Sequence, residues 1–336
     1  MQKLIAASLF LPFIGITFIL SCSPSQQDGR QVTTDTAIKA TDSALLKEYD
    51  FSGLRTDFSK HSVPLDSIHD GGVSKNGIPA IDFPEFISVE AARGFLTEPD
   101  YGILLHSKSE TRFYPFNILN WHEVVNDVLD TLPVAITFCP LCGSAIVYER
   151  LLDGDTLQFG VSGRLYESNL LMFDDKSESL WSQAMGEAVA GKYTGMKLKL
   201  LNTEVVSFEE VVEDYPSAKI LSPKTGYDRN YMQNPYGDYM TSEELYFPVS
   251  HSSKLFPAKQ MMYVVSTGSG SIAFDWLSLL KKGNATVKSP EGIVSVLVKK
   301  NIPYATINGQ PQPGYFSFWF SWFTHYGKEG LVWPDK

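Results

Sequence analysis

Short runs of apolar residues, separated by turn-forming residues, dominate the chain after about its first 50 positions. Runs rich in Val, Ile, Tyr and Phe cover residues 102–105, 112–116, 133–138, 144–148, 156–161, 262–265 and 293–298. β-Branched and aromatic residues in runs this short, punctuated by Asp153-Gly154 and Asn308-Gly309, are typical of strands joined by turns. The pattern predicts a β-rich protein of the α+β class.

Helical periodicity is scarce and predicts only short helices, at residues 89–95, 118–128, 208–215 and 276–281. The third of these has a clear start signal. Ser207 precedes it and Glu210 occupies its third position, which is the spacing of a capping box.

The order strand, turn, strand, helix, loop, strand occurs twice, at an offset of 160 residues. Residues 104–107 align with 264–267, and residues 133–138 align with 293–298, without a gap. Few residues are identical, so chance similarity between two β-rich stretches is the alternative interpretation. If the repeat is real, its second copy lacks the chemistry of the first, because Lys282 and Ile302 stand where the first copy has His122 and Cys142.

The amino terminus predicts a bacterial lipoprotein signal. Lys3 precedes an apolar run over residues 4–20, and Ser21-Cys22 follows it. The run is too short for a stable membrane span and suits a signal peptide. We therefore expect residues 1–21 to be removed and Cys22 to be lipidated; a plain signal peptide or an uncleaved anchor is the alternative.

The remaining chain divides by composition. Residues 22–48 are polar and almost free of aromatics, which predicts a disordered tether. The folded body is expected to consist of a first β-rich half at 49–255 and a shortened second half at 256–336 packed on it. Ser23 after the lipidated cysteine favours an outer-membrane protein that faces the periplasm.

Overall composition narrows the function further. An apolar fraction of 43% and an aromatic fraction of 13% predict a substantial core. The net charge of −10 argues against nucleic-acid binding, because phosphates require a basic surface. Membrane contact is expected through the lipid anchor alone, and a protein or redox partner remains possible.

The most informative motif is the C-x-x-C pair formed by Cys139 and Cys142. Strand-forming runs precede and follow it, so the pair is expected on a tight turn shaped by Pro140 and Gly143. Two thiols at this spacing can bind a soft metal, exchange electrons as a dithiol, or close a structural disulfide. An extracytoplasmic location favours oxidation of thiols that nothing protects.

A metal at this turn would need further ligands from elsewhere in the chain. The candidates are His122, Met172 and His251. Such a Cys/His/Met set is soft and favours copper(I) over zinc. Each of these three residues also has a structural interpretation: Met172 as a core residue, and His122 and His251 as hydrogen-bonded histidines.

Several longer strings, in order along the chain, resemble the prokaryotic domain-of-unknown-function family 3179. The strings cover residues 113–127, 137–144, 159–163, 165–172, 179–183 and 221–229. The resemblance extends over roughly residues 50–330 and implies an extracytoplasmic protein. It implies no activity, because the family has none established.

Three functions compete at this point. The first is soft-metal binding, with copper or zinc, or thiol redox chemistry at Cys139 and Cys142. The second is a binding or scaffold lipoprotein with a structural disulfide, whose Tyr- and Trp-rich segments 227–239 and 315–322 form a recognition surface. The third is an envelope hydrolase or transferase with catalytic residues drawn from His122, Glu123, Asp174 and Arg229.

Overall fold

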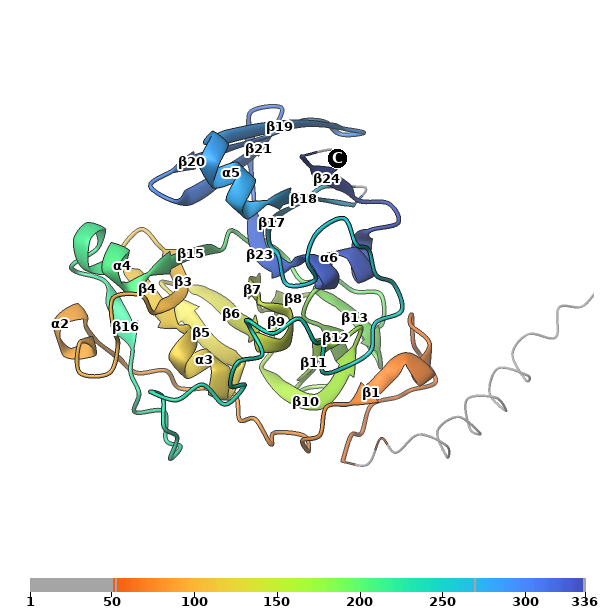
Figure 1. The fold of residues 1–336 in the computed structure, drawn as a ribbon. Coiled ribbons are helices and arrows are strands. Elements are labelled where there is room, and N and C mark those ends of the chain that lie inside the picture. The colour runs from red at the N-terminus through yellow and green to blue at the C-terminus, as the bar shows by residue number, and fades with distance from the viewer. Residues whose placement is uncertain (1–50, 52, 269, 335–336) are drawn as a thin grey trace, which may run out of the picture.

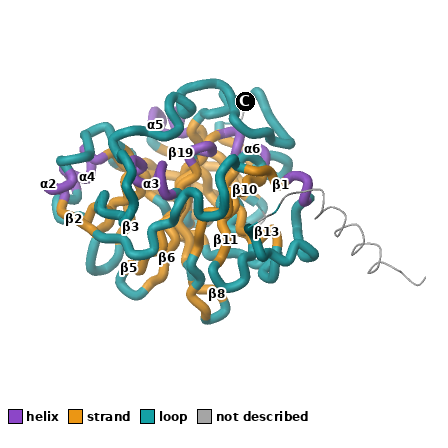
Figure 2. Tube along the Cα trace, turned by 90° about the horizontal axis from the view of Figure 1, so that it is seen from below, coloured by secondary structure: helices purple, strands orange, loops and turns teal. Residues whose placement is uncertain are grey.

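The computed structural model describes residues 51, 53–268 and 270–334. The predicted signal peptide, the tether and Cys22 lie outside the described residues. Strands form the centre of the molecule, and the short helices lie around them (Figures 1 and 2). The predicted β-rich α+β class is confirmed.

The largest sheet runs through both parts of the chain. Its strands follow the order β24-β18-β17-β23-β7-β6-β5, and β14 also pairs with β7. These strands are β5 (Val124–Leu129), β6 (Leu132–Cys139), β7 (Ser144–Glu149), β14 (Leu200–Leu201), β17 (Met261–Ser266), β18 (Ser271–Asp275), β23 (Gly314–Phe318) and β24 (Leu331–Trp333). The pairing of β23 with both β17 and β7 joins the carboxy-terminal part to the first part.

Smaller sheets surround this one. One has the order β15-β3-β4-β16-β2, from β2 (Phe86–Ser88), β3 (Tyr101–His106), β4 (Thr111–Pro115), β15 (Glu204–Ser207) and β16 (Lys219–Leu221). A second has the order β1-β10-β11-β12-β13, from β1 (Ile68–Asp70), β10 (Phe159–Tyr166), β11 (Asn169–Asp174), β12 (Leu180–Ser182) and β13 (Glu187–Ala190). A third contains β19 (Asn284–Ser289), β20 (Gly292–Lys299), β21 (Ile302–Ile307) and β22 (Gln310–Gln312), and β8 (Leu151–Leu152) pairs with β9 (Asp155–Thr156).

The helices are short. They are α2 (Val89–Ala92), α3 (Phe116–His122), α4 (Phe208–Asp214), α5 (Trp276–Lys282) and α6 (Trp319–Tyr326), with 3₁₀ turns η1 (Leu65–Ser67) and η2 (Pro140–Cys142). The capping box at Ser207 and Glu210 starts α4 as predicted. The helix expected at residues 118–128 is wrong in extent. It ends at His122, because Glu123 adopts a left-handed conformation with φ of 57°, and β5 follows.

The same elements recur 160 residues apart. The segments β3, β4, α3, β5 and β6 have the same lengths as β17, β18, α5, β19 and β20, and each begins 160 positions earlier. Their partners also correspond. A later strand pairs antiparallel with β3 and with β17, and another pairs parallel with β4 and with β18.

The C-x-x-C pair lies on a tight turn between two paired strands, as predicted. Cys139 ends β6, η2 carries Pro140 at its first position, and β7 begins at Ser144. Gly143 has φ of 54°, and a Cβ atom there would lie 2.8 Å from the ring of Phe318. Glycine is therefore required at this position by both conformation and space.

Side chains along β6 alternate between two cores. Ala135 and Cys139 belong to one cluster, whereas Ile136 and Phe138 belong to the cluster on the opposite face. This alternation follows from the two-residue period of a strand. It places the two cysteines on one face of the large sheet, with β10 and β11.

Within the part of the chain that the structure describes, no helix has the length and apolar character needed to cross a membrane.

Candidate functional site

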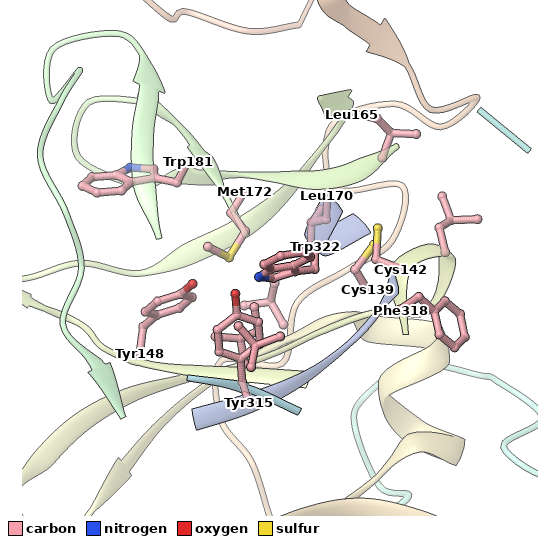
Figure 3. Packing of buried hydrophobic residues seen from close by; sticks show 14 of the residues in the cluster. Cys139, Cys142, Tyr148, Leu165, Leu170, Met172, Trp181, Tyr315, Phe318 and Trp322 are labelled. Carbon is pink, nitrogen blue, oxygen red and sulfur yellow. The ribbon is translucent and has the colours of Figure 1, made fainter. Parts of the chain in front are cut away.

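The two cysteines of the turn lie in the interior as free thiols. Cys139 is 1% exposed and Cys142 is fully buried. The two thiols lie close enough to shift each other's pKa. They lie at one end of a cluster that also contains Leu170, Phe318 and Trp322 (Figure 3). The structure therefore describes a dithiol at this turn.

Neutral hydrogen-bonding groups surround the sulfurs. Burial alone would raise the pKa of Cys142, but the influence of the nearby polar side chains of Cys139, Ser321 and Asn169 outweighs it, and its pKa is lowered. The pKa of Cys139 is raised well above its usual range, first by burial and then by the neighbouring thiol of Cys142. The Cys142 sulfur also lies 3.2 Å from the carbonyl oxygen of Ser168. Cys142 is thus the thiol that ionises more easily.

Glu123 is the charged residue that acts on both thiols. It is 5% exposed, and burial raises its pKa to about 7 although a hydrogen bond from Tyr236 opposes the shift. Its backbone holds it in place, because its N–H donates to Leu119 O and its carbonyl accepts from Phe138 N, each over 2.8 Å. The left-handed conformation of Glu123 is unfavourable for a residue with a side chain. At the corresponding end of α5 the chain has Gly283, with φ of 79°.

One irregular segment, residues 222–260, covers this region with tyrosines. It has neither helix nor strand. Tyr236 donates its hydroxyl to Glu123 Oε1 over 2.7 Å, and Tyr239 donates to Leu141 O over 3.0 Å. Tyr239 is fully buried, and Lys259 lies 3.4 Å from its ring centre. Long loops without secondary structure are uncommon in compact domains and are often lids over a site.

A cavity of about 460 Å³ lies beside the dithiol. Its walls include Glu123, Leu141, Leu170 and Tyr236 together with the side chains of Leu165 and Phe247. The two cysteines themselves are not among its lining residues. Glu123 is therefore the ionisable group that joins the cavity to the buried thiols.

His122 precedes Glu123 but serves another hydrogen-bond network. Its Nδ1 donates to Pro79 O over 2.7 Å, and its Nε2 accepts from the Tyr231 hydroxyl over 2.7 Å. Burial lowers its pKa, and the charge of Arg229 adds to that effect. The ring is neutral near pH 7, and neither nitrogen is free for a metal ion in this conformation.

The other two predicted metal ligands lie in different surroundings. Met172, on β11, is fully buried in the same cluster as the cysteines, but Trp322 is drawn between it and them (Figure 3). His251 is half-buried and lies 2.7 Å from Ser250 Oγ, beside a separate cavity of about 290 Å³. Across the described residues, no three His, Cys, Asp or Glu side chains form a group that could hold a metal ion.

The two remaining catalytic candidates, Asp174 and Arg229, lie in different parts of the structure. Asp174 is fully buried and shapes a turn, since it accepts from Ser177 N over 2.6 Å and from Trp181 Nε1 over 3.0 Å. Arg229 is exposed and lies 5.6 Å from the ring centre of Trp121, close enough to influence His122. The structure thus brings Arg229 near His122, whereas Asp174 has its own structural role.

The Tyr- and Trp-rich segments, predicted as a recognition surface in one of the three functions, have several buried aromatic side chains, whereas Tyr227 is exposed. Tyr315, Trp319, Trp322 and Tyr239 are buried in the same core cluster as the cysteines, and Tyr231 is buried in the cluster on the opposite face of the sheet. The sequence reasoning missed Tyr236, Tyr239, Asn169 and Ser321 as neighbours of the site. Their only signal was their place in the strings 227–239, 165–172 and 315–322 that had been noted for other reasons.

The fold and the site together define a β-rich protein with a buried C-x-x-C dithiol beside an acid of raised pKa. The chain belongs to the family described as "Protein of unknown function (DUF3179)", whose model matches residues 75–311. No curated protein and no solved structure matches the chain.

Proposed function

We propose that this chain is a lipid-anchored thiol redox protein of the cell envelope, which uses Cys139 and Cys142 as a dithiol that converts reversibly to a disulfide. The observation that carries the proposal is the pair of buried free thiols on one turn, each of which is influenced by the other and by Glu123. The envelope location and the lipid anchor come from the predicted signal at residues 1–22. The proposed redox site lies on the face of the large sheet that packs against β10 and β11.

Charge favours a dithiol–disulfide couple at this site. The reduced form with both thiols protonated and the disulfide are both neutral, so neither places a net charge in the interior. The main influences on the two thiols are burial, the neighbouring thiol and neutral polar side chains, and the charged group among them is the acid Glu123. A pair of thiolates beside an acid would be costly to bury without a compensating cation.

Glu123 supplies the proton transfer that this couple needs. Oxidation removes two electrons and two protons from the thiols, and the disulfide of a redox partner takes them up as it is reduced to two thiols. Cys142 attacks the partner as a thiolate and forms a mixed disulfide, and Cys139 then displaces the partner's remaining thiolate. An acid with a pKa of about 7 can take the proton of Cys139 and release it to the cavity.

The burial of both sulfurs restricts how a redox partner can reach them. A protein disulfide cannot reach them while segment 222–260 is in place. A small disulfide can enter the 460 Å³ cavity, but local movement of the cavity wall at Leu141 or Leu170 is needed before it meets a sulfur. Opening of that segment would admit a larger partner. The partner class is therefore a small disulfide, or a protein that binds when the segment moves.

A copper(I) ion between the two sulfurs is the second candidate. Thiolates are the ligands that copper(I) prefers, and two of them are sufficient for a linear site. Zinc requires four ligands, and His122 is already engaged through both nitrogens. Copper is therefore the better metal candidate.

Equilibration in glutathione buffers of stepped redox potential tests the proposal. Peptide mass mapping after alkylation then reports the oxidised fraction of Cys139 and Cys142 separately from Cys22. We expect one two-electron transition that is reversible in native protein. Cysteines that stay reduced, or stay oxidised, at every potential would contradict the dithiol function.

A parallel titration separates the two candidates. Anaerobic protein is titrated with copper(I) against a competing chelator, and Cys139→Ser serves as the ligand-deficient variant. One tightly bound equivalent that is lost in Cys139→Ser supports the copper function. Absence of stoichiometric binding, together with the reversible transition, supports the redox function.

A further inference from the structure

A second cavity, of about 510 Å³, lies on the other face of the large sheet. Gly143 and Ala145, which directly follow the C-x-x-C turn, form part of it, and so does Phe138. Phe138 and Ala145 belong to the core cluster opposite that of the cysteines. The cavity is therefore separated from the dithiol by the thickness of the sheet.

Equivalent positions of the two similar segments face this cavity. Tyr101 and Met261 begin β3 and β17, and Phe116 and Trp276 begin α3 and α5; all four residues line the cavity. Each pair is separated by 160 positions. The cavity thus lies where the two β-β-α segments of similar order meet, with one helix start contributed by each.

Aromatic side chains form much of the wall. Phe116 stacks on Phe138 with ring centres 4.1 Å apart, and Trp276 meets Phe316 edge to face at 5.0 Å. All four rings line the cavity. Flat apolar walls favour a flat apolar occupant, because aromatic rings gain energy from stacked and edge-to-face contacts beyond simple burial.

The polar groups of the cavity restrict the occupant further. Glu210 is the one charged residue among those that line it, so an anion is disfavoured. Its Oε1 accepts from Asn301 Nδ2 over 3.0 Å and its Oε2 accepts from Ser207 N over 2.8 Å. Oε2 also accepts from Ser207 Oγ over 3.0 Å, whereas Oε1 has a further lone pair, so Glu210 can accept a hydrogen bond from a ligand at Oε1.

The rim is apolar and exposed. Tyr101 is 53% exposed and Leu277 is 63% exposed, and both line the cavity. Large apolar side chains around a concave site are characteristic of ligand entrances, and the cavity has the volume of ordinary small-molecule sites.

We infer that this cavity binds an uncharged, planar aromatic compound of about two or three rings that carries a hydrogen-bond donor at its edge. Phe116 and Trp276 hold its rings, and Glu210 accepts its hydrogen. The inference is independent of the dithiol function, because the two sites lie on opposite faces of the sheet.

Titration of the full chain with N-phenylnaphthylamine tests the inference. This probe is uncharged, has linked flat rings with one N–H donor, and fluoresces in apolar sites. We expect saturable binding of one equivalent, with a Kd on the order of 10 μM from ordinary ligand efficiency. Energy transfer from tryptophan to the bound probe should fall in Trp276→Phe.

Matched variants locate the binding. Val205 lines the cavity, so Val205→Trp should fill it and weaken binding at least about tenfold. Leu277→Ala should weaken it about threefold. Leu297→Ala, at an exposed leucine outside the cavity, and Cys139→Ser, on the opposite face, should leave the Kd unchanged.

Several outcomes would overturn the inference. These are non-saturable binding, an unchanged Kd in both Val205→Trp and Leu277→Ala, or equal losses in Leu277→Ala and Leu297→Ala. Probe binding that disappears as the protein self-associates would also overturn it, because a second copy of the chain would then be the occupant. Circular dichroism confirms that each variant is folded.

Discussion

Tyr236 donates its hydroxyl to Oε1 of Glu123 over 2.7 Å, although the two residues are 113 positions apart in the chain. The bond ties the irregular segment 222–260 to the end of α3 and fixes the carboxyl group beside the thiols. Glu123 combines burial, a raised pKa and a left-handed backbone. Structural stability favours none of these, and such features are often found together at functional sites.

Glu123 makes the free energy of unfolding depend on pH. Its pKa is about 7 in the folded protein against 4.5 for a free glutamate, so the folded state binds more protons between these values. The corresponding stability is fully present below about pH 4.5 and is lost as the pH rises through 7, by about 3 kcal/mol in total. Glu123→Gln should remove this part of the pH dependence.

Urea unfolding at pH 5 and pH 8 measures the effect. The free energy of unfolding of Glu123→Gln should exceed that of wild type by more at pH 8 than at pH 5. Glu85→Gln, at an exposed acid, is the matched control and should follow wild type at both values. A wild-type-like pH dependence in Glu123→Gln would refute the assignment.

The backbone at Glu123 yields a second prediction. Left-handed conformation costs a residue with a side chain about 1–2 kcal/mol, and glycine avoids this cost. Glu123→Gly should therefore be at least about 1 kcal/mol more stable than wild type at pH 8, while Gly283→Ala, with φ of 79° and open space around a new Cβ, should be about 1 kcal/mol less stable. The midpoints of urea unfolding measure the stability change in each variant. A loss of stability in Glu123→Gly would mean that the carboxyl group contributes more to folding than its burial costs.

The two thiols should differ in reactivity. Nearby polar side chains lower the pKa of Cys142, whereas burial raises that of Cys139. With cystamine at pH 7, Cys142 in the Cys139→Ser variant should form a mixed disulfide about tenfold faster than Cys139 in the Cys142→Ser variant. Mass spectrometry of quenched samples measures both rates. Equal rates, or the reverse order, would show that another group sets the order of attack.

Segment 222–260 should control access to the thiols. Tyr239→Phe removes the donor to Leu141 O, a loss of about 1 kcal/mol that should favour opening of the segment. Alkylation of Cys139 and Cys142 in native protein should then be about fivefold faster. Tyr227→Phe, at an exposed tyrosine of the same segment, is the control. If both variants react alike, the thiols are reached by another route.

Local sequence was sufficient for much of the fold. The β-prone runs on both sides of Cys139 and Cys142 fixed the turn, because Pro140 and Gly143 restrict the backbone wherever they stand. The capping box at Ser207 likewise depends on near neighbours. The helix predicted at 118–128 failed because β5 pairs with β6 along its whole length, and this pairing outweighs helical propensity.

The site itself was only partly predictable. The C-x-x-C pair and Glu123 were visible as candidates, but their association was not, since Glu123 lies on the end of a helix and the thiols lie on a turn. The copper or zinc set of His122, Met172 and His251 remains a prediction, and the structure gives each of the three a different environment.

The sequence by itself determined the β-rich class and the turn that carries the thiols, because both depend on residues that are close together in the chain, and it determined the family through strings spread along residues 75–311. The lipid anchor stays a prediction. Only the tertiary structure decided which groups meet at the thiols. Tyr236 reaches Glu123, and Tyr239 reaches the carbonyl of Leu141 between the two cysteines, both from the distant segment that covers the large sheet. Contacts over such separations depend on how whole elements bury their apolar faces, and no local pattern encodes that choice.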